Sequence, residues 1–290
     1  MAHGSPTVFR RRLVTELRRR RDALGLSGPR VAQELGWSTS KISRLEKGQI
    51  VPGAKDVQAL LDLYEMPEPG RSRLLGLVPL ASAPEWWEKY SDAIAESYAS
   101  LLGFESGAEE RWEWQSLVLP GRLQTEEYAR AIIGNGVFGE LSPRQVKRLV
   151  ELRMERKNRL RNDALLTSRV IVDESVLSRR IGDGAVMREQ MRHLRELAGE
   201  NGLDLQVLLH SRGLPAPVPC FVLLRFPVVE GLGELYPDVL YVEDEVGGRL
   251  DEDEMRAHRY LVVFEKFSKV ALDPRESVRL IEEWERKWAV

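Results

Sequence analysis

The chain has 290 residues, more than one typical domain needs, and its 43% hydrophobic and 30% charged residues are ordinary for a globular protein. No apolar run reaches the roughly 18 residues of a membrane span, and the charged N-terminus lacks the apolar core of a signal peptide. A single cysteine, Cys220, excludes an internal disulfide, so we expect a cytoplasmic protein. From the length we expect at least two globular units.

Charge is divided unevenly along the chain. Residues 1–66 hold 12 Lys or Arg and 7 Asp or Glu, a net +5, whereas the remaining residues hold 31 and 38, a net −7. A basic head on an acidic body indicates a polyanion as the partner of the head alone. A solvated arginine-rich helix would show the same charge, so the motif in the head has to decide.

The first predicted helix runs from Phe9 to Leu24. Leu13, Leu17 and Leu24 fall on one stripe of a helix with 3.6 residues per turn, and seven arginines cover much of the remaining surface. Gly25 is expected to end the helix. We expect the arginines of this helix to contact DNA phosphates.

Two further helices are predicted within residues 27–48. Ser27 can cap the first of them, and Pro29 suits its first turn. Gly36 can take the left-handed conformation of a sharp turn between helices, after which Ser38 can cap the second helix. The residues expected to face inward are Val31, Leu35, Ile42 and Leu45, and a further helix is expected over 55–64.

The outward face of the second helix, Thr39–Lys47, carries the predicted base contacts. Short hydroxyls with one lysine and one arginine suit the major groove, where Arg or Lys donates to guanine O6 and N7. Arg44 is the favoured base reader, with a phosphate contact or an intrahelical pair as the alternative. Phosphate contacts, which position a protein without reading sequence, are expected from Arg30, Gln33 and Lys47. The full predicted DNA-binding set is Arg30, Gln33, Thr39, Ser40, Lys41, Ser43, Arg44 and Lys47.

The head also carries a family pattern. Ala32, Gly36 and Ile42 follow the spacing Ala-x3-Gly-x5-Ile, and SKISRLEKG follows at 40–48. Over residues 9–66 this pattern resembles the lambda-repressor-like (XRE) helix-turn-helix family. The resemblance implies an α-helical DNA-binding domain, which we place at residues 1–78. A helical hairpin without a DNA role is the alternative.

Residues 79–290 are predicted to form a larger α/β domain with a small mixed sheet. Residues 85–162 look largely helical. Alternating apolar residues predict a strand at Leu203–Leu209, and this strand and Val170–Val172 flank a predicted helix, which implies one parallel pair. Other predicted strands are Phe221–Phe226 and Val239–Val242. Other predicted helices lie at Arg71–Leu77, around Ile94–Leu102, from Thr125, from the Ser142 capping box, around Met187–Ala198, at Asp251–Val270 and at Asp273–Ala289.

Four segments of the body carry a second resemblance: Ser116–Arg130, Val150–Arg156, Val172–Leu177 and Phe221–Pro227. With the head, they resemble actinobacterial XRE regulators whose C-terminal domain is described as Scr1-type and antitoxin-like. Genes of that family often lie beside one for a small acidic partner protein. The resemblance therefore implies a regulator that a partner protein or a small-molecule effector modulates.

A search for enzyme chemistry gives little. The four histidines, His3, His193, His210 and His258, show no metal-ligand spacing. Cys220 lies ten residues from His210, but a small apolar cysteine that opens a strand is a better interpretation than a nucleophile–base pair. No glycine-rich phosphate loop is present. We therefore expect no enzyme, no cofactor and no metal.

An aromatic pocket is a further candidate site. Trp112 and Trp114 flank Glu113, and Gln124 follows shortly after. Aromatic walls with a few polar groups are typical of small-molecule sites, so the candidate ligand-binding residues are Trp112, Trp114 and Gln124. The favoured alternative is that both tryptophans anchor the core or a dimer interface.

Together these patterns predict a sequence-specific, nucleoid-associated transcriptional regulator whose body senses a ligand or partner and forms a homodimer. One short recognition helix reads few base pairs, so we expect two heads on the half-sites of a palindromic operator. One alternative is an antitoxin-like protein that binds a small acidic partner protein and uses DNA binding for autoregulation. Another is an enzyme that its head delivers to DNA.

Overall fold

A computed structural model of the chain describes residues 4–135, 141–162, 166–198, 203–229, 233–243 and 248–289. Contacts divide the chain into two compact units. The first unit comprises Met1–Glu88 with Phe226–Tyr236, and the second comprises Lys89–Arg225 with Pro237–Val290. The boundary expected after residue 78 lies inside a helix that continues to Ala81. Within the described part of the chain, none of the helices is long and apolar enough to cross a membrane.

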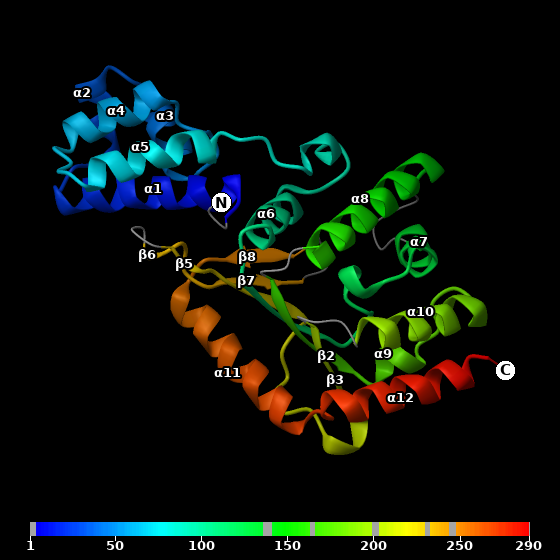
Figure 1. The fold of residues 1–290 in the computed structure, drawn as a ribbon. Coiled ribbons are helices and arrows are strands. Elements are labelled where there is room, and N and C mark those ends of the chain that lie inside the picture. Colours follow the sequence, from blue (N-terminus) through cyan, green and yellow to red (C-terminus); the bar gives the residue numbers. More distant parts are fainter. Residues whose placement is uncertain are drawn as a thin grey trace. The chain divides into compact units, whose positions relative to one another are not determined.

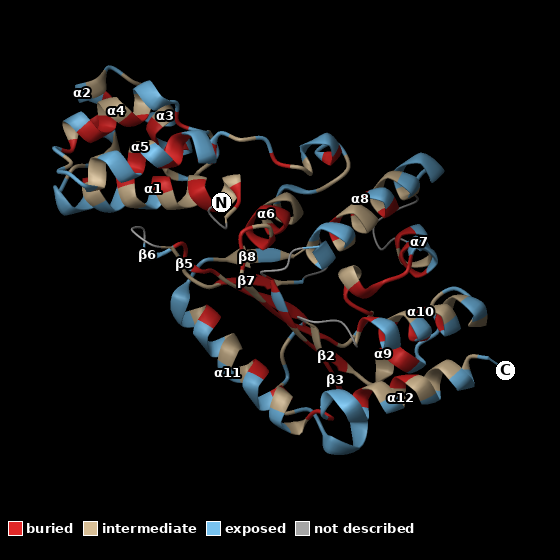
Figure 2. Cartoon of the chain, viewed as in Figure 1, coloured by how far each residue is buried: buried red, intermediate tan, exposed pale blue. Residues whose placement is uncertain are grey.

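The first unit is helical and packs around one apolar core. Figure 2 shows its helices with buried inner sides and exposed outer sides. Leu13 and Leu17 of the predicted stripe are 0% and 2% exposed, whereas Leu24, its third residue, caps the end of the helix and is 40% exposed. That helix begins earlier than expected because Ser5 caps it and Pro6 occupies its first turn. The helices described in this unit are α1 (Pro6–Ala23), α2 (Gly28–Leu35), α3 (Thr39–Glu46), α4 (Ala54–Leu63) and α5 (Gly70–Ala81).

Residues 226–236 belong to the first unit, although the residues on either side belong to the second. Their short hairpin pairs β5 (Val228–Val229) with β6 (Gly233–Glu234) in antiparallel fashion. Arg12 on α1 donates from Nη1 to the carbonyl of Glu234 at 3.1 Å, which attaches the hairpin to the first helix.

The second unit is built on a six-stranded mixed sheet with the order β3-β2-β1-β4-β7-β8. β1, β2 and β3 run parallel to one another, which confirms the parallel pair predicted for residues 169–209. β4, β7 and β8 continue the sheet with antiparallel pairing. The strands are β1 (Glu110–Gln115), β2 (Thr167–Asp173), β3 (Leu203–Leu208), β4 (Phe221–Arg225), β7 (Val239–Val242) and β8 (Arg249–Asp251).

Strand β1 corrects the interpretation of residues 85–162 as largely helical. It lies inside the sheet between β2 and β4. Its side chains alternate between the two faces, with Arg111 and Glu113 toward one and Trp112 and Trp114 toward the other. Both faces are covered, so all four side chains are buried. Charged residues at every second position hide the apolar pattern by which a buried strand is usually predicted.

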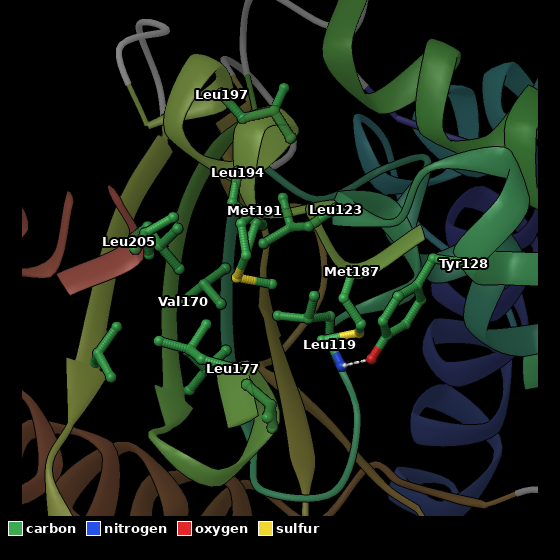
Figure 3. Packing of buried hydrophobic residues seen from close by; sticks show 14 of the residues in the cluster. Leu119, Leu123, Tyr128, Val170, Leu177, Met187, Met191, Leu194, Leu197 and Leu205 are labelled. Carbon is green, nitrogen blue, oxygen red and sulfur yellow. Dashed lines mark hydrogen bonds between the residues drawn. The ribbon is translucent and has the colours of Figure 1, made fainter. Parts of the chain in front are cut away.

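Helices cover both faces of this sheet. Helix α11 lies on one face, whereas α6, α8 and α10 lie on the other (Figure 1). Val170 and Val172 of β2 join the core beneath α10 and α12, and Ile171 between them joins the core beneath α11. The larger core is shown in Figure 3, where the Leu119 amide donates to the Tyr128 hydroxyl at 3.4 Å.

Most of the remaining helices begin at or near the residues predicted to cap them. Thr125 caps α7, and Ser142 and Gln145 exchange hydrogen bonds as a capping box at the start of α8. Asp253 caps α11. The helices of the second unit are α6 (Glu96–Glu105), α7 (Glu126–Gly134), α8 (Pro143–Asn162), α9 (Ser175–Ser178), α10 (Gly184–Leu197), α11 (Glu254–Val270) and α12 (Pro274–Lys287), with short 3-10 turns η2 (Gly121–Leu123) and η3 (His210–Arg212), and η1 (Glu88–Tyr90) at the division between the units.

Candidate DNA-binding surface

Helices α2 and α3 form a helix-turn-helix whose ends are fixed by their own side chains. The Ser27 hydroxyl accepts from the Arg30 amide at 3.3 Å, and the Ser38 hydroxyl accepts from the Lys41 amide at 3.1 Å. Between the helices Gly36 has a φ of 64°, a left-handed conformation that side chains disfavour. These three predicted features are confirmed, and they set the angle between α2 and α3.

The inner face of α3 is buried. Ile42 and Leu45 are each 2% exposed, and across from them on α2 Val31 and Ala32 are 0% and 2% exposed. Because α3 has only these two buried residues, the helix is held with its remaining side chains outward. An outward face of this kind is what a recognition helix presents to a groove.

A buried ion pair ties α1 to the end of α3. Arg21 donates from Nε and Nη2 to the two carboxylate oxygens of Glu46 at 2.6 and 3.1 Å. It also donates to the Leu26 carbonyl at 2.6 Å. The hydrogen bond with Glu46 raises the pKa of Arg21. This bidentate pair fixes α3 against α1 independently of the apolar core.

Not all arginines of α1 are available to DNA. Arg21 is 9% exposed, and Arg20 donates to the carbonyls of Tyr64 and Glu65, each at 3.0 Å. Arg11 donates to the carbonyl of Lys47 at 2.8 Å. These side chains stabilise helix ends. The other arginines of α1 are therefore the better candidates for the expected phosphate contacts.

The predicted DNA-binding residues lie on one continuous part of the first unit. Thr39, Ser40, Ser43, Arg44 and Lys47 on α3 are exposed. A hollow of about 500 Å³ lies beside them, lined by Thr39, Ser40, Ser43 and Lys47 together with Arg18, Gly28, Pro29, Ile42 and Glu46. Three hydroxyl-bearing residues and two cations therefore border a recess that runs along α3.

The other predicted contacts, Lys41, Arg30 and Gln33, are not among the residues that line this recess. Lys41 forms an ion pair with Asp56 on α4 at 2.7 Å and lies over the ring of Trp37 at 3.7 Å. Arg30 pairs with Glu34 at 2.5 Å, one turn along α2. Gln33 is exposed. Lys41 is thus held against its own domain, which the sequence pattern did not indicate.

The structure does not bring the three candidate ligand-binding residues together. Trp112 and Trp114 pack against Phe264 and Phe267 of α11, with ring centroids 5.2 and 4.5 Å apart. Gln124 belongs to the loop beneath α8, where it donates to the Leu119 carbonyl at 2.7 Å. The tryptophans serve as core anchors, which was the favoured alternative.

Sequence reasoning missed a set of buried charges in the second unit. On β1, Arg111 pairs with Glu113 and with Glu105 of α6, and Glu105 also pairs with Arg156 of α8. Arg122 and Arg156 lie in segments that carry the family resemblance, and this was the available signal. The residues come from distant parts of the chain, so no local pattern could assemble them.

The cysteine and the histidines that the search for enzyme chemistry considered belong to the second unit and not to the recognition surface of α3, except that His3 is not described. Cys220 is buried, with its Sγ 3.4 Å from the Ser116 amide. The Nε2 atom of His193 lies 2.9 Å from Nζ of Lys157, within hydrogen-bond distance. Burial, and then the charge of Lys157, lower the pKa of His193 to about 4. His3 lies outside the described residues. No group of three potential metal ligands occurs among the residues that the structure describes.

The folds of the two units agree with comparisons to known families. Residues 12–74 match a helix-turn-helix domain (HTH_31), so the first unit is of the class found in DNA-binding regulators. Residues 98–283, more than half of the chain, match the domain of unknown function DUF5753. The chain belongs to the DUF5753 family. Neither a curated protein nor a solved structure matches it.

Proposed function

We propose that the protein is a sequence-specific transcriptional regulator of the XRE type that inserts α3 into the major groove of DNA. The observation that carries the proposal is the division of α3 into a buried face, Ile42 and Leu45, and an exposed face of hydroxyls and cations. An exposed helix face fixed within a helix-turn-helix has the shape and the donors that major-groove recognition needs.

Individual roles follow from position and from existing contacts. Arg44 is exposed and has no resolved ion pair in the described structure, so its guanidinium is available to a guanine edge. Ser40 and Ser43 border the recess next to it and can contact bases or phosphates. Lys47 and Arg30, at the ends of their helices, are suited to phosphates. Lys41 has to leave Asp56 before it can contact DNA.

The second unit is proposed to regulate the first and to form a homodimer. The eight residues of α3 can read only a few base pairs, and two linked heads would give the selectivity that one lacks. A non-catalytic role is proposed for this unit, in which it senses a small-molecule effector or a partner protein. Function would then be cytoplasmic and at the nucleoid.

An antitoxin-like role remains as a second candidate. It would bind a small acidic protein, and DNA binding would serve autoregulation. The observation in its favour is a hollow of about 500 Å³ on α10 and α12 that includes Arg188, Arg192 and Trp288. Arginine and tryptophan are enriched at protein interfaces, although Glu189 and Glu285 line the same hollow and reduce its positive charge.

The proposal is tested by selection of DNA sites from a random duplex library with the full-length protein. We expect enrichment of a palindromic motif, because a dimer presents two copies of α3. Anisotropy titrations then compare the selected site with a scrambled site across a salt series. Arg44→Ala should lose about 1–3 kcal/mol of the preference for the selected site.

The matched control is Arg144→Ala, which removes an exposed arginine from the start of α8. Its binding should equal that of the wild type. Selection without any enriched motif, together with equal salt-sensitive binding to all duplexes, would contradict sequence-specific regulation and leave phosphate contact alone. Capture of a small acidic protein by a chain that fails this selection would favour the antitoxin-like role.

A further inference from the structure

The face of the sheet opposite α11 carries a buried cluster of charged side chains in the second unit. Strand β1 supplies two of them from the interior of the sheet, and the covering helices α6 and α8 supply others (Figure 1). Such groups are costly to bury unless they are paired. The cluster comprises Glu105, Arg111, Glu113, Arg122, Arg153 and Arg156, with Glu243 at its exposed edge.

Glu105 is the fully paired centre of this cluster. Arg156 donates to both of its carboxylate oxygens, from Nε at 2.7 Å and from Nη2 at 2.9 Å. Arg111 donates to one of the same oxygens at 2.7 Å and also pairs closely with Glu113. Burial alone would raise the pKa of Glu105, but the two arginines outweigh it and lower the pKa to about 2. These three residues form a closed structural unit.

Arg122 is left open in the same surroundings. Its side chain is 10% exposed, and its Nε and Nη2 are covered and have no hydrogen-bond partner among the described residues. The nearest carboxylate oxygen, on Glu113, lies 3.9 Å from Nε and already accepts from Arg111. Burial and the neighbouring Arg111 lower the pKa of Arg122 to about 9. Two donors of this guanidinium are therefore covered but not hydrogen-bonded among the described residues, although the group lies within ion-pair distance of Glu113.

The open nitrogens are those that bind carboxylates elsewhere in this chain. Arg21 uses Nε and Nη2 to hold Glu46, and Arg156 uses the same two atoms to hold Glu105. This edge of the guanidinium matches two oxygens of a planar or tetrahedral oxyanion in parallel. Arg122 has the same edge, and neither its Nε nor its Nη2 is hydrogen-bonded among the described residues.

The loop that carries Arg122 is rigidly held. Gln190 on α10 donates to the Leu123 carbonyl at 2.8 Å and accepts from the Thr125 amide at 2.7 Å. Leu119 and Leu123, on either side of Arg122, are buried in the core shown in Figure 3. A side chain fixed by such a loop loses little further freedom when a ligand binds, which favours affinity.

The charge balance of the cluster also calls for an anion. Four guanidinium groups face three carboxylates, which leaves a surplus of one positive charge when all are ionised. Burial raises the pKa of Glu243, and the adjacent Glu113 raises it further. The surplus of positive charge favours the entry of one more negative group.

We propose that Arg122 is the anchor of a small-anion site inside the DUF5753 domain, which takes a carboxylate or phosphate group of an effector through its Nε and Nη2. The site gives a chemical class to the ligand sensing proposed for the second unit, and its regulatory use rests on that proposal. Its occupancy, however, can be measured without DNA.

The test is differential scanning calorimetry of the full chain in sodium acetate, sodium phosphate or sodium chloride at equal ionic strength. Acetate or phosphate should raise the Tm of the wild type by about 3 °C relative to chloride, because a ligand stabilises the state that binds it. A rise with acetate identifies a carboxylate site, and a rise with phosphate alone identifies a phosphate site.

Two variants of Arg122 separate binding from structure. Arg122→Met should abolish the anion-dependent rise, and in chloride it should melt no lower than the wild type because it removes a buried charge whose Nε and Nη2 form no hydrogen bond among the described residues, while Glu113 keeps Arg111. Arg122→Lys keeps the charge without the two-nitrogen edge, and ¹³C-acetate line broadening should show at least about tenfold weaker binding. Arg144→Met, an exposed arginine on α8, is the matched control and should respond to anions as the wild type does.

Equal responses of the wild type and Arg122→Met to both anions would overturn the site. So would an unfolded Arg122→Met together with an Arg122→Lys that binds acetate as the wild type does, since Arg122 would then be a structural partner of Glu113. A chain that selects a DNA motif but ignores both anions would refute this site alone. A chain that binds anions but selects no motif would refute the DNA proposal alone.

Discussion

Arg21 of the first unit and Arg122 of the second have side chains that are each 10% exposed, but the two arginines differ in their hydrogen bonds. In the first unit Arg21 donates hydrogen bonds to the Glu46 carboxylate and to the Leu26 carbonyl, at donor–acceptor distances of 3.1 Å or less. In the second unit Arg122 keeps two covered nitrogens without an acceptor among the described residues. An arginine whose donors are hydrogen-bonded to the protein (a closed arginine) holds helices together, whereas one with unbonded donors (an open arginine) can still bind a ligand. The difference separates a scaffold contact from a candidate site.

The largest effect is expected at the closed centre of the second unit. Arg156→Met would leave the buried Glu105 with Arg111 as its remaining cation and release the Tyr98 hydroxyl, which Arg156 contacts at 2.8 Å. Loss of one partner from a buried pair costs about 3–5 kcal/mol, so the free energy of unfolding should fall by about that amount. Chemical denaturation followed by tryptophan fluorescence measures it. A loss below about 1 kcal/mol would erase the distinction between closed and open arginines.

A somewhat smaller loss is expected from the closed arginine of the first unit. Glu46 retains 17% exposure and can be partly hydrated once its partner is gone, so Arg21→Met should destabilise by about 3 kcal/mol. Because Arg21 fixes α3 against α1, affinity for the selected DNA should fall as well. Arg19→Met, which changes an exposed arginine of the same helix, serves as the control for stability. Unchanged stability of Arg21→Met would show that the apolar core alone positions α3.

The units should also differ in their response to acid. Burial and Lys157 lower the pKa of His193 in the second unit to about 4, below the roughly 6.5 of an unfolded chain. Between these values the unfolded chain binds a proton that the folded chain does not, so His193 makes stability fall as the pH drops from 6.5 to 4.

His193→Gln should therefore show a flatter decline of Tm over this pH range than the wild type. Glutamine can still accept from Lys157, which limits other effects of the change. His258→Gln, at an exposed histidine of α11, should decline as the wild type does. Parallel curves for all three proteins would mean that His193 is not kept neutral by its surroundings.

The same contrast explains what could be predicted from the sequence. In the first unit the signals are local: Ser27, Gly36 and Ser38 each act within a few residues, and each was predicted in its observed role. The strands β2, β3, β4 and β7 were predicted from their own apolar residues. The six-stranded sheet agrees with the expected α/β body, although it is more extensive than the small sheet anticipated.

Strand β1 and the charge cluster were beyond local reasoning. Trp112 and Trp114 alternate with Arg111 and Glu113, which is the period of a strand. Because charged residues are rarely buried, this strand was not predicted within residues 85–162, which look largely helical. Burial of Arg111 depends on Glu105, and burial of Glu105 depends on Arg156, fifty-one residues later. A site made by such long-range compensation becomes visible once the fold is known.

The smallest effect is expected at an exposed pair beside the recognition helix. Lys41 and Asp56 are 30% and 31% exposed, so Asp56→Asn should change stability by less than about 1 kcal/mol. The change frees Lys41 for a phosphate, and the slope of log Kd against log salt for the selected DNA should steepen by about 0.9. Asp62→Asn makes the same charge change on the same helix, where Asp62 pairs with Arg71 instead. If both variants steepen the slope equally, the effect comes from net charge. A steeper slope for Asp56→Asn alone would mean that Lys41 contacts DNA once it is released from Asp56.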